Sequence, residues 1–175
     1  MQRKSLSRMP CPIARSLERV GEWWSILIMR DALHGYRKFD EFQQSLGIAP
    51  NMLTRRLTAL VEDGLLERRR YSEHPPRDEY VPTQRGREFA PVLVALMAWG
   101  NRHFAPEGPA VQVVDAKTGT PAEPILVDRA TRRPIAAPDF TFAAGPAAPE
   151  RTRRRYARPS LTLSGGDAPA QRSRR

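Results

Sequence analysis

The chain has 175 residues and carries 29 Lys and Arg against 19 Asp and Glu, which gives a formal net charge of +10 at pH 7. Its single cysteine excludes an intramolecular disulfide and fits the reducing cytoplasm, and no run of about 18 apolar residues is present to cross a membrane. The positive charge favours a nucleic acid as partner, although an Arg-rich soluble protein without such a partner has the same composition.

Two helices are predicted at the start of the chain. The first begins at Cys11-Pro12, because proline suits the first helical position, and it ends at Gly21. The second covers residues 22–34 and ends at Gly35. Its apolar side chains spread over a broad surface, so we expect this helix to be buried on more than one side.

The next two helices have a helix-turn-helix pattern, with a short helix over 39–46, a turn at Gly47-Ile48 and a longer helix over 50–63. At ~100° per residue, Leu53, Leu57, Leu60 and Val61 share one side of the longer helix. Another side carries groups that suit base edges and phosphates, namely Asn51, Thr54, Arg55 and Thr58. An ordinary solvated helix face has similar spacing, but the helix-turn-helix context favours DNA contact.

A two-stranded hairpin, the wing, is predicted after these helices. Its strands cover 65–70 and 78–81, around a turn at 72–77. Four arginines are candidates for contact with phosphates or the minor groove: Arg68, Arg69, Arg70 and Arg77. Alternation along a strand places Arg68 and Arg70 on one face and Arg69 on the other. Charges that protect an edge strand from aggregation are the alternative interpretation.

A long amphipathic helix is predicted over 84–103, with Thr83 as its N-cap and a kink near its start at Pro91. This helix has more large apolar residues than a monomer of this size needs, including Trp99, and Phe104 follows it. Together with the first helix it is expected to form a two-fold dimer interface, which would place two recognition helices about 34 Å apart.

The remainder of the chain has a different pattern. Short apolar runs between turn residues predict a small hairpin or ribbon at about 111–136, and the chain from 143 onward has the composition of a disordered segment. The expected organisation is a flexible arm (1–10), a winged helix-turn-helix domain with its dimerisation helix (11–105), a β-rich extension (106–142) and a disordered tail (143–175). The fold class is mainly α with a β-hairpin wing, an α+β winged helix-turn-helix.

Residues 11–104 resemble the HxlR-type winged helix-turn-helix regulators, which are relatives of the MarR group. The resemblance lies in CPIARSL, GEWWSILIMRDAL, YRKFDEFQQSLGIAPNMLTRRLTALVEDGLLERR, HPPRDEY, PTQRGREF and VLVALMAWG. It implies a homodimer that binds palindromic operator DNA and controls transcription. The sequence departs from the family pattern at Ala49, where a capping residue such as Ser is common, at Asp78, where an apolar residue is usual, and at Pro82, where Leu is usual.

Cys11 is a candidate redox sensor. A thiol at the N-terminus of the first helix, with Arg8 and Arg15 nearby in sequence, is favoured as thiolate. The resemblance adds that some members of the family sense oxidants or electrophiles through a cysteine near this position, so an oxidant or a small molecule is the expected effector. A buried structural cysteine is the alternative, and such thiols are common.

No nucleotide-binding or hydrolase motif is present, and the three histidines lack metal-ligand spacing, so we expect no enzyme activity, no cofactor and no metal. The expected function is that of a cytoplasmic, nucleoid-associated transcriptional regulator. It would bind double-stranded operator DNA as a homodimer through helix 50–63 and wing 65–81. The alternative is a winged-helix module for protein or RNA interaction without operator specificity.

Overall fold

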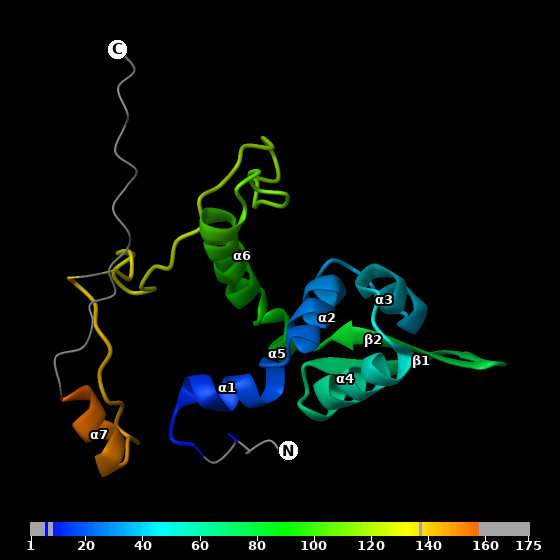
Figure 1. The fold of residues 1–175 in the computed structure, drawn as a ribbon, viewed down its shortest axis with the longest axis horizontal. Helices are drawn as coiled ribbons and strands as arrows, with labels where there is room; N and C mark the ends of the chain where they lie inside the picture. The colour runs from blue at the N-terminus through cyan, green and yellow to red at the C-terminus, as the bar shows by residue number, and fades with distance from the viewer. Residues whose placement is uncertain (1–5, 7–8, 137, 158–175) are drawn as a thin grey trace. The chain divides into compact units, whose positions relative to one another are not determined.

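The computed structural model describes residues 6, 9–136 and 138–157, and the chain divides into two units, Met1–Ala122 and Glu123–Arg175. Four helices begin the first unit: α1 (Pro12–Val20), α2 (Trp23–Leu33), α3 (Phe39–Leu46) and α4 (Pro50–Glu62) (Figure 1). All four were predicted within two residues of these bounds. None of the helices in the described ranges has the length and apolar character that a membrane span requires.

The core of the first unit forms where α2, α3 and α4 meet. Its buried apolar side chains come mainly from these helices and from the residues that lead into the hairpin: Val20, Ile28, Met29, Ala32, Phe42, Ile48, Leu53, Leu57, Leu60, Leu65 and Leu66. Helix α2 contributes three of them and also buries Ser25 and Asp31. The buried apolar side chains share one side of α2, and Trp23 on the opposite side is 73% exposed, so the burial is narrower than predicted.

The turn between α3 and α4 depends on a left-handed residue. Gly47 has φ 61°, a conformation that glycine adopts without steric cost, and Ile48 then enters the core with 3% of its surface exposed. At the other end of α3, the Glu41 carboxylate accepts the backbone N–H groups of Lys38 (2.8 Å) and Arg37 (2.7 Å). These two bonds lower the pKa of Glu41, and they fix the start of the helix.

The wing is an antiparallel hairpin of β1 (Leu66–Glu73) and β2 (Pro76–Pro82), which is longer on both strands than the sequence predicted. The register pairs Arg68 with Tyr80 and Arg70 with Asp78, and it shifts between Arg70 and Ser72. In Figure 1 the hairpin runs between α3 and α4. The chain just before α3 attaches to it, because the N–H of Tyr80 donates to the carbonyl of Arg37 at 2.8 Å.

The single kinked helix predicted over 84–103 is two helices, α5 (Gln84–Arg87) and α6 (Ala90–Phe104). Pro91 has no N–H to bond to the carbonyl of Arg87, so the helical ladder is interrupted and not merely bent. Thr83 caps α5 as predicted, since its hydroxyl oxygen accepts the N–H of Gly86 at 3.1 Å. Gly86 is required here because a Cβ at this position would overlap the carbonyl oxygen of Leu65.

Residues 106–142 contain less β-structure than predicted. Within the described ranges, strand pairing in this segment is limited to two isolated bridges, Val114 with Pro121 and Val127 with Pro134. The two bridges close equivalent turns, each of which begins with a Val-Asp pair. In each turn the aspartate carboxylate accepts the backbone N–H of the threonine three residues later: Asp115 binds Thr118, and Asp128 binds Thr131. The segment is therefore a duplicated turn with a 13-residue period, a repeat that a self-comparison of the sequence reveals.

The second unit contains α7 (Glu150–Tyr156), inside the segment that composition predicted to be disordered. An ion pair between Arg154 and Glu150 at 2.9 Å, one helical turn apart, stabilises α7, and this pairing is not visible in composition. The remainder of the tail prediction, residues 158–175, and most of the predicted N-terminal arm lie outside the described residues.

The missing cap of α4 leads to a prediction about stability. Ala49 has the extended backbone of an N-cap but no side chain that can accept a hydrogen bond. We expect Ala49→Ser to raise the free energy of unfolding by about 0.5–2 kcal/mol, because the hydroxyl would accept a free N–H of the first turn. Urea denaturation measures this change. Ala49→Val is the control, and an equal gain from valine would contradict the capping explanation.

Candidate nucleic-acid interface

Helix α4 has the two faces that its sequence predicted. Leu53, Leu57 and Leu60 are fully buried against the core. The four predicted reading residues are all exposed: Asn51, Thr54, Arg55 and Thr58. The structure therefore brings these four side chains together on the solvent side of the second helix of the helix-turn-helix.

The exposed residues differ in how far they are already engaged. The amide oxygen of Asn51 accepts the N–H of Met52 at 2.7 Å, and the hydroxyl of Thr54 donates to the carbonyl of Pro50 at 2.9 Å. Arg55 has no hydrogen-bond or ion-pair partner among the described residues. It is thus the free guanidinium on this face, and five N–H donors are available to an external acceptor.

The adjacent Arg56 has a structural role. Its Nη2 lies 3.3 Å from Oε2 of Glu22, which precedes α2, and its Nε is buried. The two neighbouring arginines therefore lie on different faces of α4, about 100° apart around the helix. The sequence prediction singled out Arg55 and not Arg56, and the exposure of the two side chains agrees with that choice.

On the wing, Asp78 engages two of the predicted phosphate-binding arginines. Its carboxylate accepts Nε of Arg68 at 2.8 Å and Nε of Arg70 at 2.7 Å, and its own side chain is only 15% exposed. These two hydrogen bonds lower the pKa of Asp78, so the carboxylate stays ionised over the whole neutral and mildly acidic range. Because both arginines reach one carboxylate, they share a face, as strand alternation predicted.

The other two wing arginines are in different states. Arg69 projects to the opposite face and pairs with Glu67 at 2.9 Å. Arg77 is exposed near the tip and has no partner among the residues that the structure describes. Among the described residues, the cation at the wing tip is therefore free, while the three arginines along β1 are each paired with a carboxylate.

Exposed apolar side chains also lie on α1 (Ile13 and Leu17) and on α6 (Val92, Leu96, Trp99 and Phe104), and these six residues are named the apolar face. No residue of α6 is buried within the chain. Trp99 and Phe104 pack edge to face with ring centroids 4.9 Å apart, and they are 54% and 66% exposed. A large aromatic cluster of this kind on the surface of a monomer is typical of an interaction site.

Cys11 is at the N-cap of α1 and is partly exposed. Of the two arginines near it in sequence, Arg15 uses its Nε to donate to the carbonyl of Met9 at 2.8 Å, and Arg8 lies outside the described residues. Over the described ranges, no three His, Cys, Asp or Glu side chains are close enough together to hold a metal ion.

The profile of the HxlR-like helix-turn-helix family matches residues 19–108. Rv3095 of Mycobacterium tuberculosis, an uncharacterized HTH-type transcriptional regulator, is 39% identical over 135 residues, which are 77% of this chain and 85% of the relative. An alignment of that length continues past residue 108 into the duplicated turns.

The solved structures that resemble the chain include the following two. PA1374 from Pseudomonas aeruginosa, described as a candidate transcription factor, is 60% identical, covers 83% of this chain and 99% of its own, and has a TM-score of 0.61. The redox regulator HypR in its reduced form is 30% identical, covers 55% of this chain and 99% of its own, and has a TM-score of 0.51. On this evidence the chain belongs to the HxlR-like helix-turn-helix family of transcriptional regulators.

Proposed function

We propose that this regulator binds palindromic operator DNA as a homodimer, with α4 in the major groove and the wing tip on the adjacent backbone. The observation that carries the proposal is the exposed guanidinium of Arg55 on the outward face of α4, which has no partner among the described residues. The fork of an arginine can bond to O6 and N7 of guanine at once, which is the commonest specific contact in the major groove.

The dimer part of the proposal is supported by the apolar face. In a two-fold interface each residue of this face is used twice, and two copies of α4 would then contact successive major grooves about 34 Å apart. The positive charge of the chain adds attraction to any DNA sequence, whereas the α4 face supplies the preference among sequences.

Selection of bound sequences from a random DNA pool tests the proposal directly. We expect one enriched motif that is palindromic, with half-sites about 10 base pairs apart between their centres. If no motif is enriched and DNA binding disappears at physiological salt, the alternative is favoured: a winged-helix module for protein or RNA interaction without operator specificity.

The Arg68–Asp78–Arg70 cluster leads to a prediction about salt dependence. Asp78→Asn removes the carboxylate that neutralises both arginines, so random DNA should bind more tightly. Arg68 would be released, and Arg70 would keep only its longer ion pair with Glu73 at 3.6 Å. Together they would add up to two phosphate contacts, each of which steepens the plot of log K against log salt by about 0.9. Fluorescence anisotropy at several salt concentrations measures the slope.

Glu107→Gln is the matched control for Asp78→Asn, because it makes the same change in net charge at an exposed position after α6. We expect its slope to equal that of the wild type. An unchanged slope for Asp78→Asn would mean that Arg68 and Arg70 do not reach phosphates even when they are free.

We also propose that Cys11 makes DNA binding sensitive to oxidants or electrophiles. Two observations support this proposal. The thiol is partly exposed at the start of α1, which carries part of the apolar face, and the chain is similar to the redox regulator HypR. A group added to Cys11 would disturb the dimer interface and hence the spacing of the two α4 helices. Operator affinity should fall after diamide or quinone treatment, and Cys11→Ser should be insensitive. If mass spectrometry shows that Cys11 is modified but the operator affinity is unchanged, the proposed switch is disproved.

A further inference from the structure

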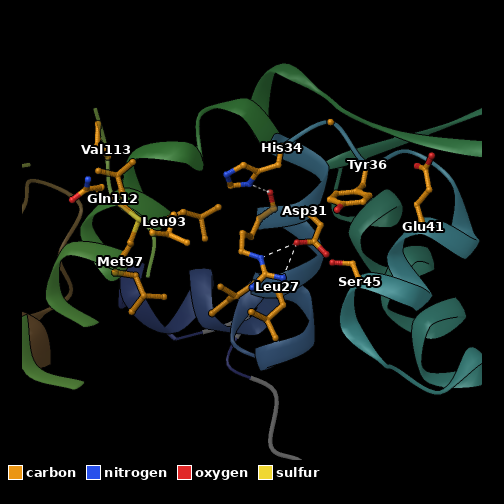
Figure 2. Close-up of a pocket in the computed structure, with 16 residues that line it drawn as sticks. Leu27, Asp31, His34, Tyr36, Glu41, Ser45, Leu93, Met97, Gln112 and Val113 are labelled. Carbon is orange, nitrogen blue, oxygen red and sulfur yellow. Dashed lines mark hydrogen bonds and ion pairs between the residues drawn. The ribbon is translucent and has the colours of Figure 1, made fainter. Parts of the chain in front are cut away.

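A cavity of about 1020 Å³ opens within the first unit between α2, α3 and α6, with residues 111–113 on a further side. Figure 2 shows Leu93 and Met97 of α6 on one side of it, Glu41 and Ser45 of α3 on the other, and Asp31 of α2 between them. Its volume is at the upper end of the range of about 300–1,000 Å³ that small-molecule sites occupy. None of the described residues that line it belongs to α4 or to the wing.

Half of the sixteen lining residues are aliphatic or Met, among them Ile26 and Leu27 of α2, Leu93, Leu96 and Met97 of α6, and Val113. The polar groups gather at the end of α2 and the adjoining face of α3. An apolar chamber with a few polar groups on one wall is the usual form of a site for a small organic molecule.

The polar wall contains an acceptor that the protein leaves unsatisfied. The Asp31 side chain is 5% exposed, and its Oδ1 accepts both Nε (2.8 Å) and Nη2 (2.7 Å) of Arg30. Its Oδ2 is buried and has no hydrogen-bond partner among the described residues. Leaving a buried carboxylate oxygen without a donor is costly, so a donor that arrives with a ligand would be favourable here.

The neighbouring groups do not supply that donor. The fork of Arg30 is directed at Oδ1, and Glu41 is itself an acceptor whose Oε2 binds two backbone N–H groups. The charges of Arg30, Asp31 and Glu41 sum to one excess negative charge on the cavity wall. A cationic donor therefore matches this wall better than a neutral or an anionic one, because a hydrogen bond between two charged groups is the stronger kind.

We propose that this cavity is an effector site for a small apolar molecule with a protonated amine. Its ammonium donates to the Asp31 carboxylate, once rotation of that side chain turns the covered Oδ2 toward the cavity, and its apolar body packs between α2 and α6. Its regulatory consequence rests on the proposed function. Because α3 belongs to the helix-turn-helix and α6 to the apolar face, a ligand that contacts both helices changes how the two α4 helices of a dimer fit their operator.

Isothermal titration of the full chain, without DNA, tests the site with three probes of one shape: 4-phenylbutylamine, 4-phenylbutanol and 4-phenylbutanoate. We expect saturable binding of the amine, binding of the alcohol weaker by about tenfold or more, and none of the carboxylate, since about 1.4 kcal/mol corresponds to tenfold. Equal binding of all three probes would overturn the proposal. The absence of saturable binding would overturn it as well, and would result if a second copy of this chain filled the cavity.

Two variants and one control locate the binding. Asp31→Asn should abolish the preference for the amine over the alcohol. Since Asn could disturb the end of α2, Leu93→Trp provides an independent test: it fills the cavity from α6, leaves Asp31 in place and should block both probes. Asp40→Asn changes an exposed carboxylate on α3 outside the cavity and should bind as the wild type does.

A parallel measurement with operator DNA separates this proposal from the proposed function. Absence of any preferred DNA sequence would refute operator binding and leave the titration result standing. Saturable, Asp31-dependent binding of the amine with no change in operator affinity would refute the regulatory coupling.

Discussion

Replacing Arg55 with alanine is expected to weaken binding to the preferred DNA sequence by about 1–3 kcal/mol, roughly 5- to 150-fold, and to relax the preference at one base pair of each half-site. The physical reason is that the guanidinium is exposed and has no partner in the described structure, so all of its donors are available to the DNA. For the same reason the folded state should lose almost nothing, about 0.5 kcal/mol at most. Anisotropy titrations with the preferred and a scrambled sequence measure both effects on DNA binding, and urea denaturation measures the stability.

Arg69→Ala is the matched control, because it removes the same side chain and the same charge from a residue that Glu67 already neutralises. It should leave the sequence preference unchanged and weaken all sequences slightly. Arg77→Ala should weaken all sequences evenly and more strongly, since the tip arginine is unpaired among the described residues. If Arg55→Ala distinguishes the preferred from the scrambled DNA sequence as well as the wild type does, α4 reads DNA through another residue or not at all.

The faces of α4 could be predicted from sequence because they depend on local geometry alone. The helical period places Leu53 and Leu57 together, and the need to bury them determines which way Arg55 points. The strand period similarly places Arg68 and Arg70 on one face of β1. Neither prediction requires knowledge of a residue that is distant in the chain.

The state of the wing arginines could not be predicted in this way. Asp78 lies ten residues from Arg68 and eight from Arg70, and it meets both because of the register of the hairpin, including the shift after Arg70. The departure from the family pattern at Asp78 was the visible sign, but only the paired strands explain it. The cavity beside Asp31 is less predictable still, since three helices and a later segment of chain must come together to form it.

The apolar face leads to the other large expected effect. Trp99 and Phe104 pack edge to face against each other and are more than half exposed, and no residue of α6 is buried within its own chain. Burial of one such side chain in an interface contributes about 1.5–3 kcal/mol, and a two-fold interface buries it once per subunit. Trp99→Ser should therefore weaken the dimer by about 3–6 kcal/mol, which raises its dissociation constant by a factor on the order of 10² to 10⁴.

Operator affinity should fall with the dimer, because a monomer of the Trp99→Ser variant contacts only one half-site at a time. Sedimentation velocity over a concentration series measures the dissociation constant, and anisotropy with a palindrome and with a single half-site measures the loss on DNA. The affinity for the palindrome should fall toward that for a single half-site. The affinity for the single half-site should stay the same, since α4 itself is unchanged. Ile125→Ser, which removes another apolar side chain that is more than half exposed and lies outside α1 and α6, should leave both measurements unchanged. If Trp99→Ser remains a dimer with normal affinity for the palindrome, α6 does not form the subunit interface, and another surface must hold the two recognition helices in register.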